Sequence, residues 1–139
     1  MNAEIKQKAL DFIKTTRICH MATIDGDKPH SRVMSVGRID ADFTCYFAIL
    51  ASSRKVRHLT ANPQVSLSFY DGKMDCTVNG AGQVVNDQAV KDELWNDHLA
   101  EYYKGGKTDP EYMILKITPA SVRFRDFTSS GHTPVELIK

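Results

Sequence analysis

Three cations fall where a short helix is expected to begin. The segment 52–63 reads SSRKVRHLTANP, in which the serine pair is typical of a helix N-cap and the Asn-Pro pair of a helix end. Arg54, Lys55 and Arg57 then occupy the first turns, although a helix N-terminus already carries about half a positive charge and each added cation costs about 0.3–1 kcal/mol there. One interpretation is a solvated charged face. The other is an anion site, in which the Ser53 hydroxyl, helix N–H groups and the cations converge on a phosphate.

The segment 30–39, HSRVMSVGRI, contributes a further cation. Successive side chains of a strand point to opposite faces, so Arg32 shares a face with His30 and Met34. Both faces of this segment mix polar with apolar side chains, which is typical of a strand with one side near a polar ligand. The alternative for Arg32 is an ordinary surface ion pair with a carboxylate.

Several well-known catalytic motifs are missing from the sequence. It contains no GxSxG elbow, HExxH pair or Walker loop, so acyl transfer, zinc proteolysis and P-loop hydrolysis have no support. The aspartates at 25, 27, 40 and 42 indicate turns rather than an acid–base pair. The cysteines and histidines lack zinc-ligand spacing, so we expect no metal. Trp95, Tyr102 and Tyr103 are expected in the core or at an interface, with stacking on an aromatic cofactor as the alternative.

Composition limits the class of protein. The 139 residues carry a net charge of +1, which gives no overall field for binding nucleic acid or an anionic membrane. No apolar run approaches the roughly 20 residues of a helical span. Cys19, Cys45 and Cys76 lie in apolar segments, typical of buried thiols in a reducing compartment. Because the first residues are charged and lack an apolar signal segment, we expect one cytoplasmic domain, 1–139.

The hydrophobic pattern changes its period along the chain. Apolar residues at helical spacing predict an N-terminal helix at 3–15, and the basic helix at 52–63 is the second. A third helix is expected to begin after Asn86-Asp87 and to place Val90, Leu94, Trp95, Leu99 and Tyr102 on its apolar side. Strands are expected at 17–24, 30–39, 43–49, 64–70, 75–85, 112–118 and 121–127.

These elements predict a mainly β fold with flanking helices, a six- to seven-stranded antiparallel barrel with its core at about 17–127. Gly80 and Gly82 inside the strand 75–85 indicate a bulge or bend in that barrel. Residues 128–139 are expected to form a mobile tail, whose Val135, Leu137 and Ile138 could dock on a partner chain. The basic helix directly follows a strand, so a ligand held there by its phosphate can extend along the sheet.

At this level of detail the chain resembles the pyridoxamine 5′-phosphate oxidase-related flavin-binding split barrels, and most closely their general stress protein 26 group. The resemblance covers about residues 17–127. It rests on the following segments in order: SRVMSV (31–36), FAILASSRKVRHLTANPQVSLSF (47–69), VNGAGQVV (78–85), DELW (92–95), GGKTDPEYMILKITP (105–119) and VRFRDF (122–127).

The resemblance implies a homodimer of split barrels of the FMN-binding type, with the flavin at the subunit interface. The residues that it implies for the phosphate are Arg32, Ser53, Arg54 and Lys55. Those that it implies for the isoalloxazine ring, through their backbone, are Val33, Met34, Ser35, Ala48 and Ile49, and Trp95 is included as a cofactor contact. On this view the negative charge that the cations at 54–57 lack is the flavin phosphate.

The resemblance also implies a function, a flavin-dependent oxidoreductase in the general stress response whose ring accepts a hydride from a donor such as a nicotinamide nucleotide. The alternatives are a flavin-binding sensor module without turnover, or a split barrel for FAD, a deazaflavin or haem, the last with His20, His30 or His98 as axial ligand. Vitamin B6 oxidation is not expected, because FTSSGHTPVELIK (127–139) lacks the arginine- and histidine-rich C-terminus of true pyridoxamine phosphate oxidases. No catalytic acid or base stands out.

Overall fold

Strands form most of the molecule, with one helix before them and two between them. The computed structural model describes residues 2–129 and 133–138. In chain order these residues form α1 (Asn2–Thr16), β1 (Ile18–Asp25), β2 (Lys28–Ser35), β3 (Arg38–Ile39), β4 (Cys45–Leu50), α2 (Arg54–Ala61), β5 (Gln64–Tyr70), β6 (Met74–Val85), α3 (Gln88–Leu94), the 3₁₀ helices η1 (Asp97–Glu101) and η2 (Gly106–Thr108), β7 (Tyr112–Asp126) and β8 (Val135–Ile138).

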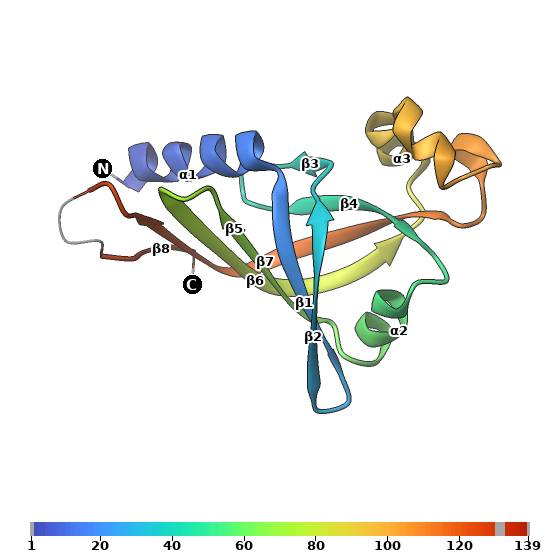
Figure 1. Ribbon diagram of the computed structural model, residues 1–139, viewed down its shortest axis with the longest axis horizontal. Helices are drawn as coiled ribbons and strands as arrows, with labels where there is room; N and C mark the ends of the chain where they lie inside the picture. The colour runs from blue at the N-terminus through green and yellow to red at the C-terminus, as the bar shows by residue number, and fades with distance from the viewer. Residues whose placement is uncertain (1, 130–132, 139) are drawn as a thin grey trace.

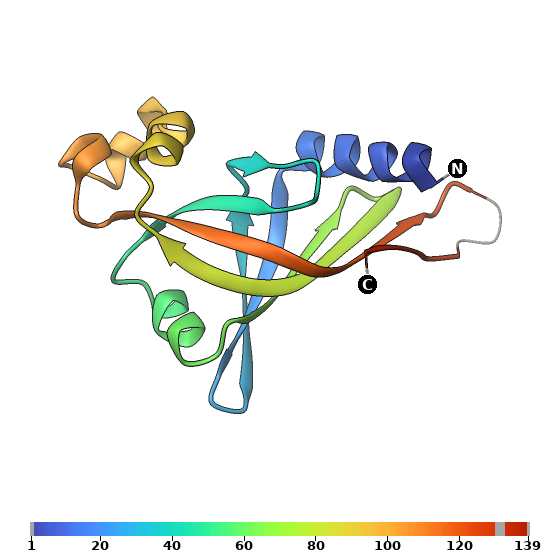
Figure 2. The ribbon, with the colours of Figure 1, turned by 180° about the vertical axis from the view of Figure 1, so that it is seen from behind.

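One curled antiparallel sheet contains all the strands of the described residues. Its order is β2-β1-β5-β6-β7-β4-β3, with β8 paired to β7. β2 and β3 follow each other directly in the chain but lie at opposite ends of this order, so the sheet has to curl until its two ends meet (Figures 1 and 2). The predicted split-barrel fold class is therefore confirmed, with eight strands in the described residues where six to seven were expected.

The expected strand 30–39 is divided where the two ends of the sheet meet. Between β2 and β3, the Val36 N–H donates to the Arg17 carbonyl and the Gly37 N–H donates to the Tyr46 carbonyl, both at 2.8 Å. A Cβ on Gly37 would lie 2.5 Å from the Leu94 side chain, so a glycine is needed for α3 to approach here. This division adds one short strand to the count.

The two expected strands 112–118 and 121–127 are instead the single strand β7. One edge of β7 pairs with β6 from Ile114 to Asp126, while the other edge pairs first with β4 and then with β8. The β6–β7 register shifts at Asn79/Gly80, which confirms the predicted bulge and lets the ladder continue past Pro119. A Cβ on Gly80 would lie 2.0 Å from the Thr118 carbonyl oxygen, so only glycine fits there.

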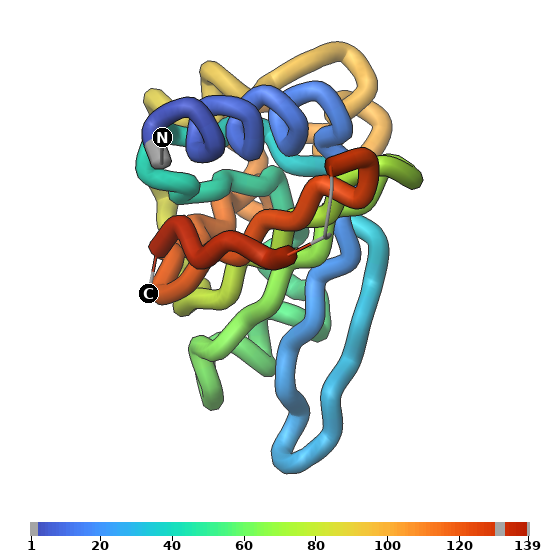
Figure 3. Tube along the Cα trace, turned by 90° about the vertical axis from the view of Figure 1, so that its left-hand side faces the viewer, coloured from blue at the N-terminus to red at the C-terminus, as the bar shows by residue number. Residues whose placement is uncertain are grey.

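The prediction of a mobile tail is wrong for Val135–Ile138. These residues form β8, which pairs with Val122–Phe124 of the same chain (Figure 3). Leu137 and Ile138 are partly buried and pack against the core of their own subunit. The part of the expected tail at 130–132 and 139 lies outside the described residues.

Helix α3 is shorter than the expected helix. It begins as predicted, because the Asp87 side chain accepts the N–H groups of Ala89 and Val90. It ends at Leu94, and the Asn96 side chain then caps a separate 3₁₀ turn, η1, by accepting the Leu99 N–H. This restart changes the helical phase, so Tyr103 is buried and Tyr102 is exposed, the reverse of the expected apolar side.

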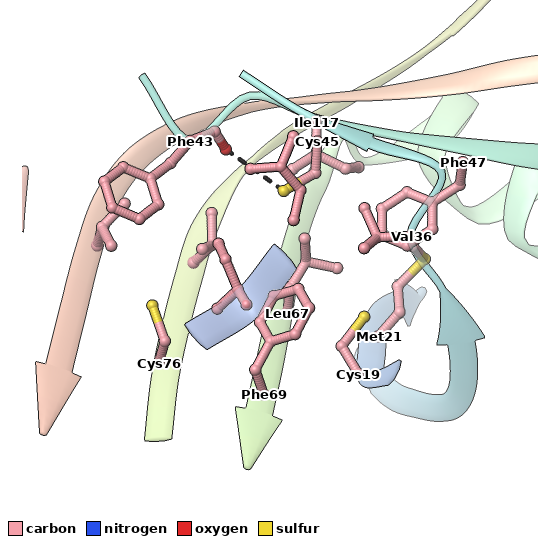
Figure 4. Packing of buried hydrophobic residues seen from close by; sticks show 14 of the residues in the cluster. Cys19, Met21, Val36, Phe43, Cys45, Phe47, Leu67, Phe69, Cys76 and Ile117 are labelled. Atoms are coloured by element: carbon pink, nitrogen blue, oxygen red, sulfur yellow. Dashed lines mark hydrogen bonds between the residues drawn. The ribbon is translucent and has the colours of Figure 1, made fainter. Parts of the chain in front are cut away.

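The main core lies inside the curled sheet (Figure 4), and α1 packs against it. α1 contributes Ala9, Leu10, Phe12 and Ile13, close to the predicted stripe. The three cysteines are free and buried, and burial raises the pKa of the Cys19 and Cys76 thiols to about 12. They act as small apolar core residues, as expected. In the part of the chain that the structure describes, no helix is long and apolar enough to cross a bilayer.

Candidate functional site

Ser53 is the N-cap residue of α2, as predicted. Ser53 has the extended backbone of an N-cap residue, yet its side chain makes no capping hydrogen bond. Its Oγ is buried and has no hydrogen-bond partner among the described residues. A buried hydroxyl without a partner is costly, of the order of 1–3 kcal/mol, and such groups point to a missing ligand or water.

Contacts on both sides hold this helix start in place. The turn before α2 is tied to β7, because the Ala51 N–H donates to the Glu111 carbonyl and the Ser52 hydroxyl donates to the Glu111 carboxylate. On the other side, the buried Leu59 of α2 lies over β6, where a Cβ on Gly82 would be 3.1 Å from it. The turn before α2 is thus held by the residue that precedes β7, and the C-terminal half of α2 packs on β6.

Arg32, Arg54 and Lys55 cluster at this helix start without an acidic partner. No carboxylate in residues 2–129 and 133–138 forms an ion pair with any of the three. Burial, and then the charge of Arg32, lower the pKa of the Lys55 ammonium. Burial, and then the charge of Arg54, lower the pKa of the Arg32 guanidinium. The cations therefore repel one another, and an anion placed among them would relieve that repulsion.

The four cations near the start of α2 differ in their exposure. Arg54 and Arg57 are exposed, as a solvated face would have them, but Lys55 and Arg32 are half-buried. The surface ion pair considered for Arg32 is absent from the described residues. Instead, one guanidinium nitrogen of Arg32 donates to the Thr23 hydroxyl at 2.7 Å and to the Met21 carbonyl at 3.3 Å.

A groove of about 630 Å³ opens beside Lys55. Its floor is formed by β2 and β4, and its far wall by α3, η1 and the residues after them. α2 and α3 lie on either side of β4 at the same end of the barrel (Figures 1 and 2). The volume is within the range of small-molecule sites, about 300–1,000 Å³.

The structure brings most of the predicted site residues together around this groove. Seven of the ten line it: Val33, Met34, Ser35, Ala48, Ile49, Lys55 and Trp95. The other three, Arg32, Ser53 and Arg54, do not line the groove but lie near Lys55, which does. Ser53 and Arg54 immediately precede Lys55 at the start of α2, and the charge of Arg32 acts on Lys55. The roles of all ten residues toward a ligand stay predictions.

Aromatic residues form the wall opposite the cations. The Trp95 ring packs 5.5 Å from the Tyr112 ring and 6.4 Å from the Tyr103 ring, between ring centroids. Tyr103 and Tyr112 are buried, and burial raises the pKa of each phenol to about 12, so both stay neutral. Trp95 is half-buried, so it packs against these tyrosines and also lines the groove.

Arg17 also lines the groove, although it was not among the predicted site residues. Arg17 has a left-handed backbone with φ 60°, and its guanidinium donates to the carbonyls of Val36 and Gly37 at 2.9 Å each. These bonds hold the β2–β3 link, which lines the groove. No local pattern indicates this role, because it depends on a contact between distant residues.

The curled antiparallel sheet defines a split barrel, with a groove between β2, β4 and α3. The family profile described as "Pyridoxamine 5'-phosphate oxidase like" matches residues 4–137. The chain belongs to this family. It is 31% identical to General stress protein 26 of Bacillus subtilis (strain 168) over an alignment 139 positions long, which covers 96% of each chain.

Solved structures agree with this assignment. General Stress Protein 26 from Bacillus anthracis str. Sterne superposes with a TM-score of 0.80 at 27% identity, covering 87% of this chain and 93% of that chain. A pyridoxamine 5′-phosphate oxidase-related, FMN binding protein from Nostoc punctiforme superposes with a TM-score of 0.73. At 12% identity, with 96% of this chain and 93% of that chain covered, the second shows the fold alone.

Proposed function

We propose that the protein binds FMN, with the phosphate at the start of α2 and the isoalloxazine ring in the groove. The observation that carries the proposal is the buried Ser53 Oγ, which has no partner in the described residues and lies at a helix N-terminus among unpaired cations. A phosphate would accept hydrogen bonds from Ser53, Arg32 and Lys55 and would offset their mutual repulsion. The FMN-binding relative from Nostoc punctiforme adds support.

The groove suits a flat aromatic ring with a polar edge. Its floor residues Val33, Met34 and Ala48 provide apolar surface. β2 is an end strand of the sheet in the described residues, so one edge of its backbone has N–H and C=O groups for the polar ring edge. Trp95 provides an aromatic wall on the α3 side.

We further propose that this is a flavin-dependent oxidoreductase with a role in the general stress response, and not a true pyridoxamine 5′-phosphate oxidase. Bound flavin would supply a ring that accepts a hydride from a reduced nicotinamide nucleotide. The chain itself would bind the phosphate, orient the ring and exclude water from one ring face. The name of the Bacillus subtilis relative supports the stress role.

A second candidate is a flavin-binding module without turnover. The floor of the groove favours it, because Val33, Met34, Ser35, Ala48 and Ile49 include no acid or base, while Glu93 and His98 belong to the far wall. Anaerobic addition of NADH or NADPH separates the two. Loss of the flavin absorbance near 450 nm supports the oxidoreductase, and a stable oxidised spectrum supports the binding module.

The proposal includes a homodimer with the flavin at its interface. Val33 is 59% exposed and Leu50 is 38% exposed, and both line the groove, so apolar surface is left open where a second copy would cover the ring. The free, buried cysteines fit a cytoplasmic location. Sedimentation of the flavin-loaded protein tests the dimer, and a monomer with full flavin occupancy would contradict it.

Titration of the flavin-free protein with FMN, FAD and riboflavin tests the cofactor. We expect FMN to bind at least about tenfold more tightly than riboflavin, because riboflavin lacks the phosphate and one charge-assisted hydrogen bond contributes about 1.5–3 kcal/mol. Mass analysis of any ligand released from purified protein identifies the natural occupant. Equal affinity for FMN and riboflavin, or no flavin binding, would overturn the proposal.

A further inference from the structure

A buried polar pair lies behind the cation cluster. Thr23 is on the core side of β1 and is 0% exposed, and His58 on α2 is 4% exposed. The Thr23 Oγ1 is 2.9 Å from the His58 Nδ1 and 2.7 Å from the Arg32 guanidinium nitrogen. One hydroxyl therefore connects a histidine of α2 to the arginine of β2.

The donor and acceptor roles in this chain follow from chemistry. A guanidinium can only donate, so the Thr23 oxygen accepts from Arg32. Thr23 is fully buried, and its hydroxyl has the His58 Nδ1 as its one other partner in the described residues, so the hydroxyl proton points there. Nδ1 is then an acceptor, which makes His58 a neutral imidazole with its proton on Nε2.

The surroundings of His58 agree with a neutral ring. Its Nε2 is 3.7 Å from a carboxylate oxygen of Asp25, at the end of β1, and its ring lies 5.1 Å from the His30 ring on β2. Burial lowers the pKa of His58, the charge of Asp25 raises it, and His30, Arg32 and Arg57 lower it further. The net effect is a pKa below the ordinary value, which favours the neutral form.

Arg32 needs such a restraint. Arg54 and Lys55 repel it in the free protein, and without Thr23 its side chain would keep, in the part of the chain that the structure describes, a 3.3 Å bond to the Met21 carbonyl. A cation that is held in place before the ligand arrives loses less freedom on binding. The Thr23 hydroxyl, itself oriented by His58, supplies this restraint.

We propose that Thr23 and His58 are positioning residues that hold the Arg32 guanidinium for the phosphate of bound FMN, an inference that rests on the proposed function. They act through Arg32 and do not contact the ligand. Removing the Thr23 hydroxyl should therefore weaken the binding of phosphate-bearing flavin, and only while Arg32 is present.

A double-mutant cycle at Thr23 and Arg32, measured with FMN and with riboflavin, tests the positioning role of Thr23. Thr23→Val keeps the side-chain shape and removes the hydroxyl, and we expect about a five- to tenfold weaker FMN affinity. Thr23→Ser keeps the hydroxyl and should restore affinity to within about twofold of wild type. In an Arg32→Met background, Thr23→Val should change FMN affinity by less than about twofold. Riboflavin affinity should be the same in wild type and Thr23→Val, whereas a merely damaged fold would weaken both flavins.

The protonation state of His58 provides a second measurement that needs no flavin. In ¹⁵N NMR spectra of the free protein at pH 7, we expect Nε2 protonated and Nδ1 bare. An Nδ1-protonated or doubly protonated ring, or Thr23→Val with wild-type FMN affinity, would overturn the positioning role. If wild type bound no FMN, the proposed function would fail instead, and the same variants titrated with inorganic phosphate would decide the role of Thr23.

Discussion

Replacement of Lys55 by methionine tests the anion site most directly. Lys55 lines the groove at the start of α2, is half-buried, and is repelled by Arg32 in the free protein. Methionine keeps the length of the side chain and removes its charge. We therefore expect opposite effects on ligand affinity and on the stability of the free protein.

The expected loss of affinity follows from the position of Lys55. A hydrogen bond from a charged donor contributes about 1.5–3 kcal/mol, and the half-exposed ammonium places Lys55 at the lower end because water screens part of the interaction. A loss of about 1.5–2 kcal/mol corresponds to an FMN dissociation constant about ten- to thirtyfold higher. The Tm of the free protein should stay the same or rise, since a repelled, partly desolvated charge is removed.

Fluorescence titration with FMN and thermal melts of the flavin-free protein measure the two effects. Lys73→Met is the matched control, because Lys73 is exposed in the turn between β5 and β6, and it should change neither quantity. Unchanged FMN affinity in Lys55→Met would show that Lys55 is only a solvated residue. A Tm well below that of Lys73→Met would show that Lys55 stabilises the fold and would refute the argument from repulsion.

Three further changes test other parts of the structure. Ser53→Ala removes the unpartnered hydroxyl, so FMN affinity should fall about tenfold without a lower Tm of the free protein; a marked drop in Tm would show a hidden capping role. Gly80→Ala forces a Cβ to 2.0 Å from the Thr118 oxygen, and denaturant melts should show more than about 3 kcal/mol lost, against about 1–2 kcal/mol for Gly26→Ala, which has only its positive φ to strain it. The lowered pKa of His58 means that the unfolded chain binds a proton that the folded chain does not, so stability should be full above about pH 6.5 and fall below it. His58→Gln should flatten the dependence of Tm on pH between 5 and 7, and an unchanged slope would contradict the buried neutral ring.

Much of the local structure could be predicted because its causes are local. α2 lies between its N-cap Ser53 and its C-cap Asn62, as the capping residues indicate. β5 has the predicted bounds, since Val65, Leu67 and Phe69 alternate with polar residues over a single half-buried strand. The bulge at Gly80 was predicted from a glycine within a strand pattern.

The candidate site was predicted in part. The cations at the start of α2 are visible in the sequence because they conflict with the helix dipole. The family resemblance supplied the residues of β2 and β4, and the structure gathers these with Lys55 and Trp95 around one groove. The unpartnered Ser53 hydroxyl was not predictable, because its isolation depends on what packs around it.

Other features were decided only by the tertiary structure. β7 is continuous and Val135–Ile138 form β8 because partner strands lie beside them, and no local pattern records those partners. The sequence by itself determined where most helices and strands lie, such as α1, α2 and β5, and where cations gather, since these depend on neighbours a few residues apart. Only the folded chain brings Thr23 to His58, 35 residues away, and makes one buried hydroxyl the link to Arg32.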